Sequence, residues 1–442
     1  MIDKLIVLGG AGDLTMRYLL PALAELDAAG RLDPALRVVS VVRNEESARE
    51  YGGRVRDALD EACADAGVAR RVSALHGDAT DAGALRQAAA GARGVAAYLA
   101  LPPSAVPGAV EALAEAGLPP GSRVVLEKPF GDDVASARAL NALLARRFER
   151  ESVLRVDHFL GLRAVRNLAA FRAANRAIDA ALSAEHVERV EVTWDETLRL
   201  EGRAGYYDGT GALRDMVQSH LLQVLAMFAM DAPASYDPAD IALARLDVLR
   251  RTRLRGDGAD GAVLRARYGK AEDGDSVAYV DEEGVDPSKG TETFVRVELE
   301  VQGPRWEGVT FALRTGKALA RDRAEVTVVF RPGATPGAPA NRLVFDLLDG
   351  AIALDASAAD GDDALRPVRL EGRPGGRALS AYARVLDAAL RGDGSVSVGP
   401  AEPEESWRIV APALAAFRDG RAPLETYPAG SDGPEPGGGR RG

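Results

Sequence analysis

The sequence predicts an α/β domain with a parallel sheet, followed by an α+β domain with a large, mainly antiparallel sheet. Up to about residue 156, short apolar runs alternate with stretches of helical length, a rhythm typical of βαβ units. Beyond that point most apolar runs follow one another without a helix between them, which favours antiparallel strands. The chain has 442 residues, and this length fits two or three domains.

The elements of the first domain are predicted from local patterns. Short apolar runs indicate strands at residues 5–8, 38–42, 71–75, 95–101 and 124–126. A helical pattern covers residues 18–29, and helical stretches separate the later strands. We therefore expect a first domain over residues 1–156.

The second domain is expected over residues 157–428, followed by a tail. Its predicted strands are residues 187–193, 294–301, 309–313, 325–330 and 343–348. Its two strongest helices are predicted at residues 212–229 and 377–390. Residues 429–442 are polar and rich in glycine and proline, so we expect them to be disordered.

Composition narrows the classes of function. The chain carries 66 acidic and 55 basic side chains, a net charge of −11, which argues against nucleic acid or an anionic membrane as partner. No apolar run reaches the roughly 18 residues of a membrane-spanning helix, and the first residues do not resemble a signal peptide. Cys63 is the only cysteine, so no internal disulfide can form. We expect a cytoplasmic protein.

Lysine is rare in this chain. Five of the 55 basic residues are lysines and the rest are arginines. Arginine does not reproduce the compact, titratable ammonium of lysine. Lysines that persist in such a composition, among them Lys128 and Lys317, therefore mark positions of possible chemical importance.

A glycine-rich turn follows the first predicted strand. The run is Gly9-Gly10-Ala11-Gly12-Asp13-Leu14-Thr15, and a helix follows it. Glycines let the backbone approach a pyrophosphate, and the helix start offers unpaired N–H groups. Thr15 stands where the usual pattern has a third glycine. A plain tight turn would explain the glycines alone, but the position between strand and helix favours a dinucleotide.

The end of the second strand bears on the choice of cofactor. NAD sites commonly have an acidic residue there, whereas this strand is followed by Arg43. A guanidinium pairs well with a 2′-phosphate. We therefore favour NADP, with NAD possible; a solvated arginine at a strand end is the alternative reading.

Several later segments, in order, carry a resemblance. They are Glu127-Lys128-Pro129-Phe130-Gly131, Arg155-Val156-Asp157-His158-Phe159-Leu160-Gly161, Gly205-Tyr206-Tyr207-Asp208, Arg214-Asp215-Met216-Val217-Gln218-Ser219-His220-Leu221-Leu222-Gln223 and Leu313-Arg314-Thr315-Gly316-Lys317. With the glycine turn, they resemble the glucose-6-phosphate dehydrogenase family over nearly the whole chain. The resemblance implies a Rossmann domain for NADP and a homodimer, or dimer of dimers, formed through the large sheet. It also implies hydride transfer from carbon 1 of a hexose 6-phosphate to NADP, giving a lactone, with no metal.

The reaction itself points to His220. Oxidising a sugar hemiacetal requires a base that takes the hydroxyl proton, and histidine titrates in the right range. A buried structural histidine is the alternative interpretation. Asp215 lies five residues before His220 on the predicted helix, a spacing that does not make a facing pair on an α-helix.

The resemblance assigns the remaining roles. It pairs Asp157 with His220, and it gives Asp215 and Glu196 to the sugar hydroxyls. It gives His158 and Lys317 to the sugar phosphate. Lys128 would contact both substrate and cofactor, before a cis peptide bond to Pro129.

The phosphate site departs from the family pattern. The family has tyrosine where this chain has Phe159, lysine at Leu162 and a basic residue at Asp322. A dianion buried with too few cations is unfavourable. The candidates for replacing the lost cations, each close in sequence to a changed position, are Arg163, Arg166, Arg321 and Arg323. The alternatives are a same-fold dehydrogenase for an unphosphorylated or amino sugar, and an inactive regulatory paralogue.

Overall fold

A computed structural model describes residues 2–200, 202–256, 261–272, 274, 276–333, 339–359, 365–376 and 378–434. The chain forms two compact units. One comprises residues 1–163, 233–243 and 377–404, and the other residues 164–232, 244–376 and 405–442.

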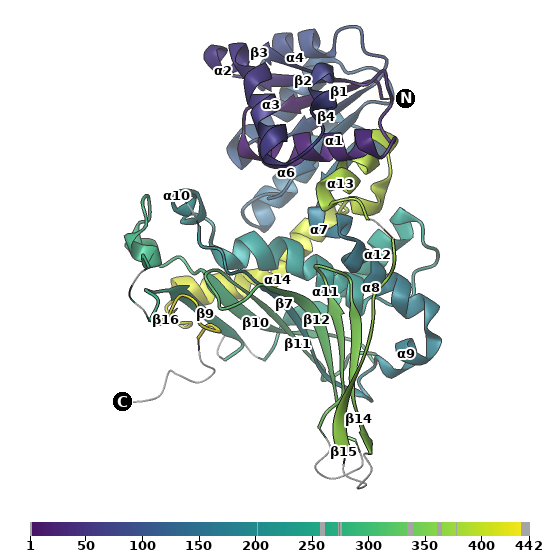
Figure 1. Cartoon of the computed structure of the whole chain (residues 1–442), viewed down its shortest axis with the longest axis vertical. Coiled ribbons are helices and arrows are strands. Elements are labelled where there is room, and N and C mark those ends of the chain that lie inside the picture. The colour runs from purple at the N-terminus through teal and green to yellow at the C-terminus, as the bar shows by residue number, and fades with distance from the viewer. Residues whose placement is uncertain are drawn as a thin grey trace. The chain divides into compact units, whose positions relative to one another are not determined.

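The first unit is built on a parallel sheet (Figure 1), as the sequence predicts. In its described part the six strands lie in the order β3-β2-β1-β4-β5-β6, and every pairing is parallel. The bounds are β1 Lys4–Leu8, β2 Arg37–Val42, β3 Val72–His76, β4 Val95–Leu99, β5 Arg123–Glu127 and β6 Val153–Val156. Strand β4 is buried along its whole length, which explains its uninterrupted apolar sequence.

Helices accompany this sheet, and one of them comes from late in the chain. They are α1 Leu20–Ala28, α2 Glu45–Arg49, α3 Tyr51–Glu61, α4 Ala82–Ala89, α5 Val106–Ala116, α6 Val134–Arg147, α7 His158–Gly161 and α13 Ala381–Arg391. The sequence assigned residues 377–390 to the second domain, whereas α13 lies in the first unit against α1. Its apolar side chains Ala383, Val385 and Leu386 are buried in the same core as Leu5 and Val7 of β1.

The second unit contains a large mixed sheet that is mainly antiparallel, as predicted. Among the described residues its order is β15-β14-β13-β12-β7-β11-β10-β9-β16, with β8 paired to β10. The bounds are β7 Val187–Asp195, β8 Thr252–Leu254, β9 Val263–Tyr268, β10 Phe294–Val301, β11 Thr310–Gly316, β12 Arg323–Phe330, β13 Arg342–Asp346, β14 Ile352–Ala359, β15 Leu365–Gly372 and β16 Leu424–Tyr427. Only the β7–β11 and β9–β16 pairings are parallel in this part of the chain.

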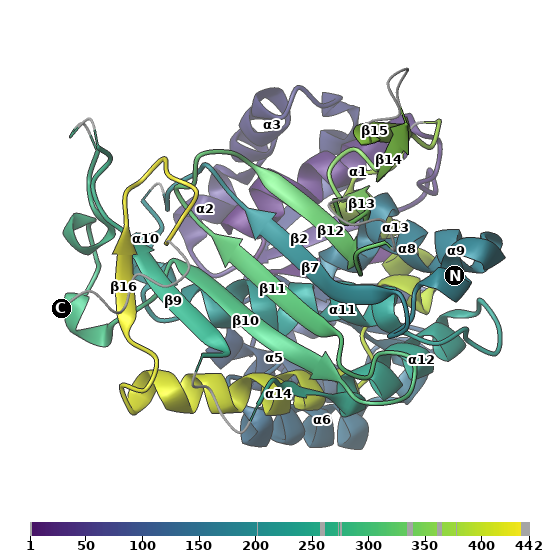
Figure 2. The same ribbon diagram turned by 90° about the horizontal axis from the view of Figure 1, so that it is seen from below.

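Helices cover one face of the second sheet. Figure 2 shows β9, β10, β11, β7 and β12 side by side, with α11 and α14 behind them. The remaining helices of the chain are α8 Arg163–Ala174, α9 Arg176–Ala181, α10 Ala204–Tyr207, α11 Leu222–Ala229, α12 Pro238–Arg251 and α14 Ala401–Arg418. The first residues of α12 and α14 belong to the first unit. Burial alternates along β10, as expected for a sheet with one covered face. Within the described ranges, no helix combines the length and apolarity needed to cross a membrane.

The start of the expected tail is ordered. Residues 429–434 are described, and they bond to the loop after β11. Gly430 N–H donates to the Ala318 carbonyl at 2.8 Å, and Ala320 N–H donates to the Ser431 carbonyl at 2.8 Å. Arg314 donates to the Asp432 carbonyl at 2.6 Å. The prediction of disorder is therefore wrong for residues 429–434, because their backbone groups have partners, and residues 435–442 lie outside the described part.

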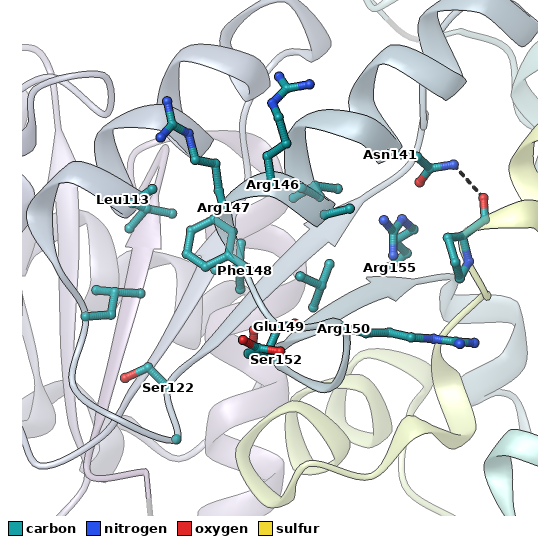
Figure 3. Close-up of a pocket in the computed structure, with 18 of the residues that line it drawn as sticks. Leu113, Ser122, Asn141, Arg146, Arg147, Phe148, Glu149, Arg150, Ser152 and Arg155 are labelled. Atoms are coloured by element: carbon teal, nitrogen blue, oxygen red, sulfur yellow. Dashed lines mark hydrogen bonds between the residues drawn. The ribbon is translucent and has the colours of Figure 1, made fainter.

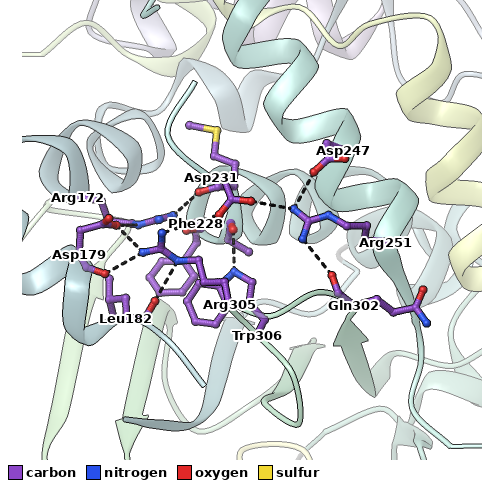
Figure 4. Close-up of polar contacts among 12 residues, drawn as sticks. Arg172, Asp179, Leu182, Phe228, Asp231, Asp247, Arg251, Gln302, Arg305 and Trp306 are labelled. Carbon is purple, nitrogen blue, oxygen red and sulfur yellow. Dashed lines mark hydrogen bonds and ion pairs between the residues drawn. The ribbon is translucent and has the colours of Figure 1, made fainter. Parts of the chain in front are cut away.

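A buried arginine holds the carboxyl end of α11 (Figure 4). The Arg172 guanidinium donates to the carbonyls of Phe228 and Met230 and pairs with Asp179 at 2.8 Å. The indole N–H of Trp306 donates to the Ala229 carbonyl at 2.8 Å. The last carbonyls of a helix have no donor within the helix, so these side chains supply the missing hydrogen bonds.

Replacing Arg172 with alanine is expected to lower the free energy of unfolding by about 3 kcal/mol, because the buried carbonyls lose a charged donor. Urea denaturation of the full chain measures this. Arg176→Ala is the control, since Arg176 is exposed at the start of α9, and it should stay within about 0.5 kcal/mol of the parent. Equal losses in the two variants would contradict this account of the helix end.

Candidate active site

The glycine turn after β1 has no room for side chains. A Cβ on Gly9 would lie 2.1 Å from the Ala100 carbonyl oxygen, and φ is +87° at this residue. A Cβ on Gly10 would lie 2.4 Å from the Cβ of Ser40. Both positions therefore require glycine, and the backbone at Gly9, Gly10 and Gly12 is left bare next to the start of a helix. This arrangement fits the pyrophosphate of a dinucleotide.

Thr15, at the position of the missing third glycine, stabilises the turn through its side chain. Its side chain is 1% exposed, and its hydroxyl donates to the Gly9 carbonyl at 3.2 Å. Thr15 begins a π-helical segment, Thr15–Leu19, that leads into α1. This hydrogen bond therefore links the start of the helix to the first glycine of the turn.

Two residues of α3 support the turn, and the sequence analysis missed them. The Tyr51 hydroxyl is placed to bond the Gly10 carbonyl at 3.0 Å and the Ser40 hydroxyl at 2.7 Å. Arg54 donates to the Ala11 carbonyl at 3.0 Å. No local pattern predicts these contacts, because α3 lies some forty residues beyond the turn.

Arg43 follows the carboxyl end of β2, next to the turn. Gly10 N–H donates to the carbonyl of Val41, a residue near the end of β2, so strand end and turn are adjacent. Arg43 and Asp13 are exposed, and Leu14 is half-buried against the core. An exposed guanidinium at this place suits a cofactor phosphate.

Lys128 follows β5 at the same edge of the sheet. The preceding Glu127 is half-buried and accepts a hydrogen bond from the Tyr98 hydroxyl. Burial raises the pKa of Glu127 to about 7. The Lys128–Pro129 peptide bond is cis, as the resemblance implied.

Asp157 lies between β6 and α7, and His158 is the first residue of α7. Asp157 is 2% exposed, and its carboxylate caps α7 by accepting from Phe159 N–H at 2.9 Å. The His158 ring stacks on Tyr382 of α13, with centroids 5.0 Å apart and an angle of 16°. Phe159 is 3% exposed, so its ring is part of the packing of the first unit.

His220 lies in the second unit, on the predicted helix. It is 1% exposed and belongs to a π-helical segment, Leu213–Leu221, that precedes α11. In the α-helical geometry expected from the sequence, Asp215 and His220 do not face each other. Hydrogen bonds in a π-helix join residues five apart, as Leu222 N–H does with the Val217 carbonyl. Asp215 and His220 are therefore about one turn apart, which corrects that expectation.

The amino end of this helical segment is fixed by Glu292, which the sequence analysis missed. The Glu292 carboxylate accepts from Leu213 N–H at 2.9 Å, and its backbone carbonyl accepts from Ala212 N–H at 3.0 Å. Burial raises the pKa of Glu292. Gly211, with φ +73°, leaves space for that carboxylate, since a Cβ there would lie 2.6 Å from it. A glycine directly before the helix was the one available sequence signal.

Glu196 and Lys317 meet at the carboxyl ends of the parallel strands β7 and β11. The Lys317 ammonium donates to the Glu196 carboxylate, and both side chains are mostly buried. Glu196 N–H donates to the Gly316 carbonyl at 2.9 Å, and Lys317 N–H donates to the Thr293 carbonyl at 3.0 Å. The structure therefore brings together two predicted substrate ligands, one cationic and one anionic.

Asp322, the acidic residue expected near the sugar phosphate, has a local role. Asp322 accepts from the N–H and the hydroxyl of Thr197 at 2.7 and 2.9 Å. Arg323, a candidate replacement cation, pairs instead with Asp195 at 3.0 Å, as Arg314 does at 3.1 Å. Arg321 is exposed.

Family models match both parts of the chain. The model of the NAD binding domain of glucose-6-phosphate dehydrogenase matches residues 6–167. The model of the C-terminal domain of the same enzyme matches residues 169–437.

Individual relatives agree with these matches. The chain is 36% identical to glucose-6-phosphate 1-dehydrogenase 2 of Mycobacterium tuberculosis, covering 98% of this chain and 91% of the relative. It is 37% identical to glucose-6-phosphate 1-dehydrogenase of Gluconobacter oxydans, covering 97% and 94%. The crystal structure of the Mycobacterium avium enzyme is similar with a TM-score of 0.87 and 33% identity, covering 98% and 95%. A glucose-6-phosphate dehydrogenase in complex with glucose-6-phosphate is similar with a TM-score of 0.88 and 29% identity, covering 98% and 96%. The chain therefore belongs to the glucose-6-phosphate dehydrogenase family and is an oxidoreductase of that type.

Proposed function

We propose that this protein is an NADP-dependent glucose-6-phosphate 1-dehydrogenase that oxidises carbon 1 of the sugar to a lactone. The observation that carries the choice of a sugar phosphate is the Lys317–Glu196 pair, which offers a cation and a hydroxyl acceptor at one strand edge. The relatives named above bear the same activity in their names, and one similar structure holds this substrate.

The base in the proposed reaction is His220. It takes the proton of the carbon 1 hydroxyl as a carbonyl forms at that carbon, and a bound nicotinamide cofactor supplies the hydride acceptor. Asp157 stabilises the resulting imidazolium and selects the tautomer of the ring. Lys128 contacts both substrate and cofactor. The buried position of His220, on a segment capped by Glu292, suits a base that must keep its orientation.

The cofactor is held by the first unit in this proposal. The bare backbone at Gly9, Gly10 and Gly12, followed by Asp13 and Leu14, receives the pyrophosphate. The exposed Arg43 pairs with the 2′-phosphate and so favours NADP, with NAD as the weaker alternative.

The sugar is recognised by carboxylate acceptors and by cations. Glu196 and Asp215 accept from the sugar hydroxyls, and Lys317 and His158 bind the phosphate. The hydrogen bonds between Asp322 and Thr197 argue against an acidic group reserved for an amino sugar.

The proposal also includes the oligomeric state, the metabolic role and the cellular location of the protein. We assign a homodimer formed through the large sheet, supported by the exposed apolar side chains Leu365, Val368 and Leu370 of β15. The protein would act in glucose metabolism, at the entry of the pentose phosphate pathway. The cytoplasmic location expected from the composition stays part of the proposal.

Replacing His220 with alanine is expected to lower kcat at least about 100-fold, since the general base is lost. The rate of NADPH formation at saturating glucose 6-phosphate measures this. His186→Ala is the matched control, because that side chain is 49% exposed, and its rate should equal that of the parent. An unchanged rate in His220→Ala would refute the assigned mechanism.

Arg43→Ala is expected to raise KM for NADP about tenfold or more while leaving KM for NAD within about twofold, because only NADP loses a charge-assisted hydrogen bond. Steady-state kinetics with each cofactor test this. Arg49→Ala serves as control, since Arg49 is exposed and pairs with Glu45 at 2.5 Å. If Arg43→Ala weakened both cofactors alike, the 2′-phosphate assignment would fail.

The substrate is tested by comparing glucose 6-phosphate, glucose and glucosamine at matched concentrations with NADP. We expect kcat/KM to be at least about 100-fold higher for glucose 6-phosphate, the scale of one or two charge-assisted hydrogen bonds to the phosphate. Asp322→Asn keeps an acceptor for Thr197, so the same preference should persist. A preference for glucosamine that disappears in Asp322→Asn would instead establish an amino sugar as substrate.

A further inference from the structure

A pocket lies within the first unit, at the amino ends of β5 and β6 (Figure 3). Its volume is about 660 Å³, within the usual range for small-molecule sites. Ser122 directly precedes β5 and Ser152 directly precedes β6, and both line the pocket. The glycine turn follows the carboxyl end of β1. Because the strands are parallel, the pocket and the turn belong to opposite edges of the sheet.

Arg155 of β6 is the unusual member of this pocket. The residue is 6% exposed, and its Nε has no hydrogen-bond partner among the described residues. Burial and the charge of Arg150 lower the pKa of Arg155 to about 10. A buried guanidinium without full hydrogen bonding is costly, and an anion in the pocket would remove that cost.

The surroundings of Arg155 reinforce the positive charge. Figure 3 shows Arg150 next to Arg155, while Arg146 and Arg147 extend away from them. The carboxylate that acts on Arg155 is Glu404, and it is already engaged by Arg138 at 3.1 Å and Asn141 at 2.8 Å. Glu149 is the only carboxylate among the described residues that line the pocket. Arg155 and Arg150 are therefore poised to share one anion.

The rest of the wall is largely apolar. Leu113 comes from α5, Leu144 from α6 and Val153 from β6, and Phe148 adds an aromatic ring. An inorganic ion would fill little of this volume. The lining suits a ligand with an apolar or aromatic part attached to the anionic group.

We propose that this pocket binds a phosphorylated small molecule, with its phosphate between Arg155 and Arg150 and its apolar part against Leu113, Leu144 and Phe148. The site is separate from the residues assigned to substrate and cofactor, so the proposal does not depend on the proposed function.

The test is isothermal titration calorimetry of the full chain with phenyl phosphate and with inorganic phosphate. NADPH and glucose 6-phosphate are present at saturation, so that other phosphate-binding sites are filled without turnover. We expect one phenyl phosphate per chain, bound at least about tenfold more tightly than inorganic phosphate. Arg155→Gln and Arg150→Gln should each weaken binding about tenfold or more, as loss of a charge-assisted hydrogen bond implies.

Arg147→Gln is the matched control, because Arg147 lines the same pocket but pairs with Glu111 at 2.5 Å; it should bind like the parent. Should Arg155 variants fail to fold, the exposed Arg150 still tests the site. A second readout is thermal: phenyl phosphate should raise the Tm of the parent and not that of Arg155→Met. The absence of saturable binding, or parental affinity in Arg150→Gln, would overturn the proposal, and so would equal affinity for the two phosphates.

Discussion

The parallel direction of the strands in the first sheet is the constraint on which the candidate site depends. Carboxyl ends of parallel strands gather at one edge, and there β1, β2, β5 and β6 deliver Gly9, Arg43, Lys128 and Asp157. These residues are far apart in sequence, and the parallel sheet alone brings them to the same edge. The amino ends gather at the other edge, where Ser122 and Ser152 line a pocket of different character that also contains Arg155 of β6. One sheet therefore offers two chemically distinct edges.

A second requirement holds the helix that carries His220 in place. The unpaired N–H groups at its start and the unpaired carbonyls at its end need hydrogen-bond partners. At its amino end the free N–H groups are taken by Glu292, 79 residues beyond Leu213. At the end of α11 the free carbonyls are taken by Arg172 and Trp306. Each partner comes from outside the helix, so the helix cannot shift without exposing buried polar groups. The position of a buried histidine is thereby set by residues that act at the two ends of its helix.

The sequence predicted what local patterns encode. Strands β1 to β5 of the parallel sheet were found because buried strands are continuous apolar runs, whereas β6 was not predicted. The glycine turn was found because of its position between strand and helix. Strand β15 was missed since all of its residues are exposed and Pro367 interrupts it. The π-helical segment was missed because its pattern is that of an ordinary amphipathic helix. The roles of Glu292, Tyr51 and Arg172 could not be predicted, because each of these side chains bonds to residues distant in sequence.

The residues around Glu196 show why an acidic side chain must be judged in its surroundings. Asp322 looks from the sequence like a repulsive charge, yet its carboxylate accepts two hydrogen bonds from Thr197. On the other side of Glu196, Asp195 is neutralised by Arg314 and Arg323. Asp322 therefore holds Thr197, while Arg314 and Arg323 hold Asp195, so both chain neighbours of Glu196 have polar partners. Arg323, which seemed free to replace a lost cation, is committed to Asp195. The Glu196–Lys317 pair is thus supported by the polar contacts of the two residues that flank Glu196.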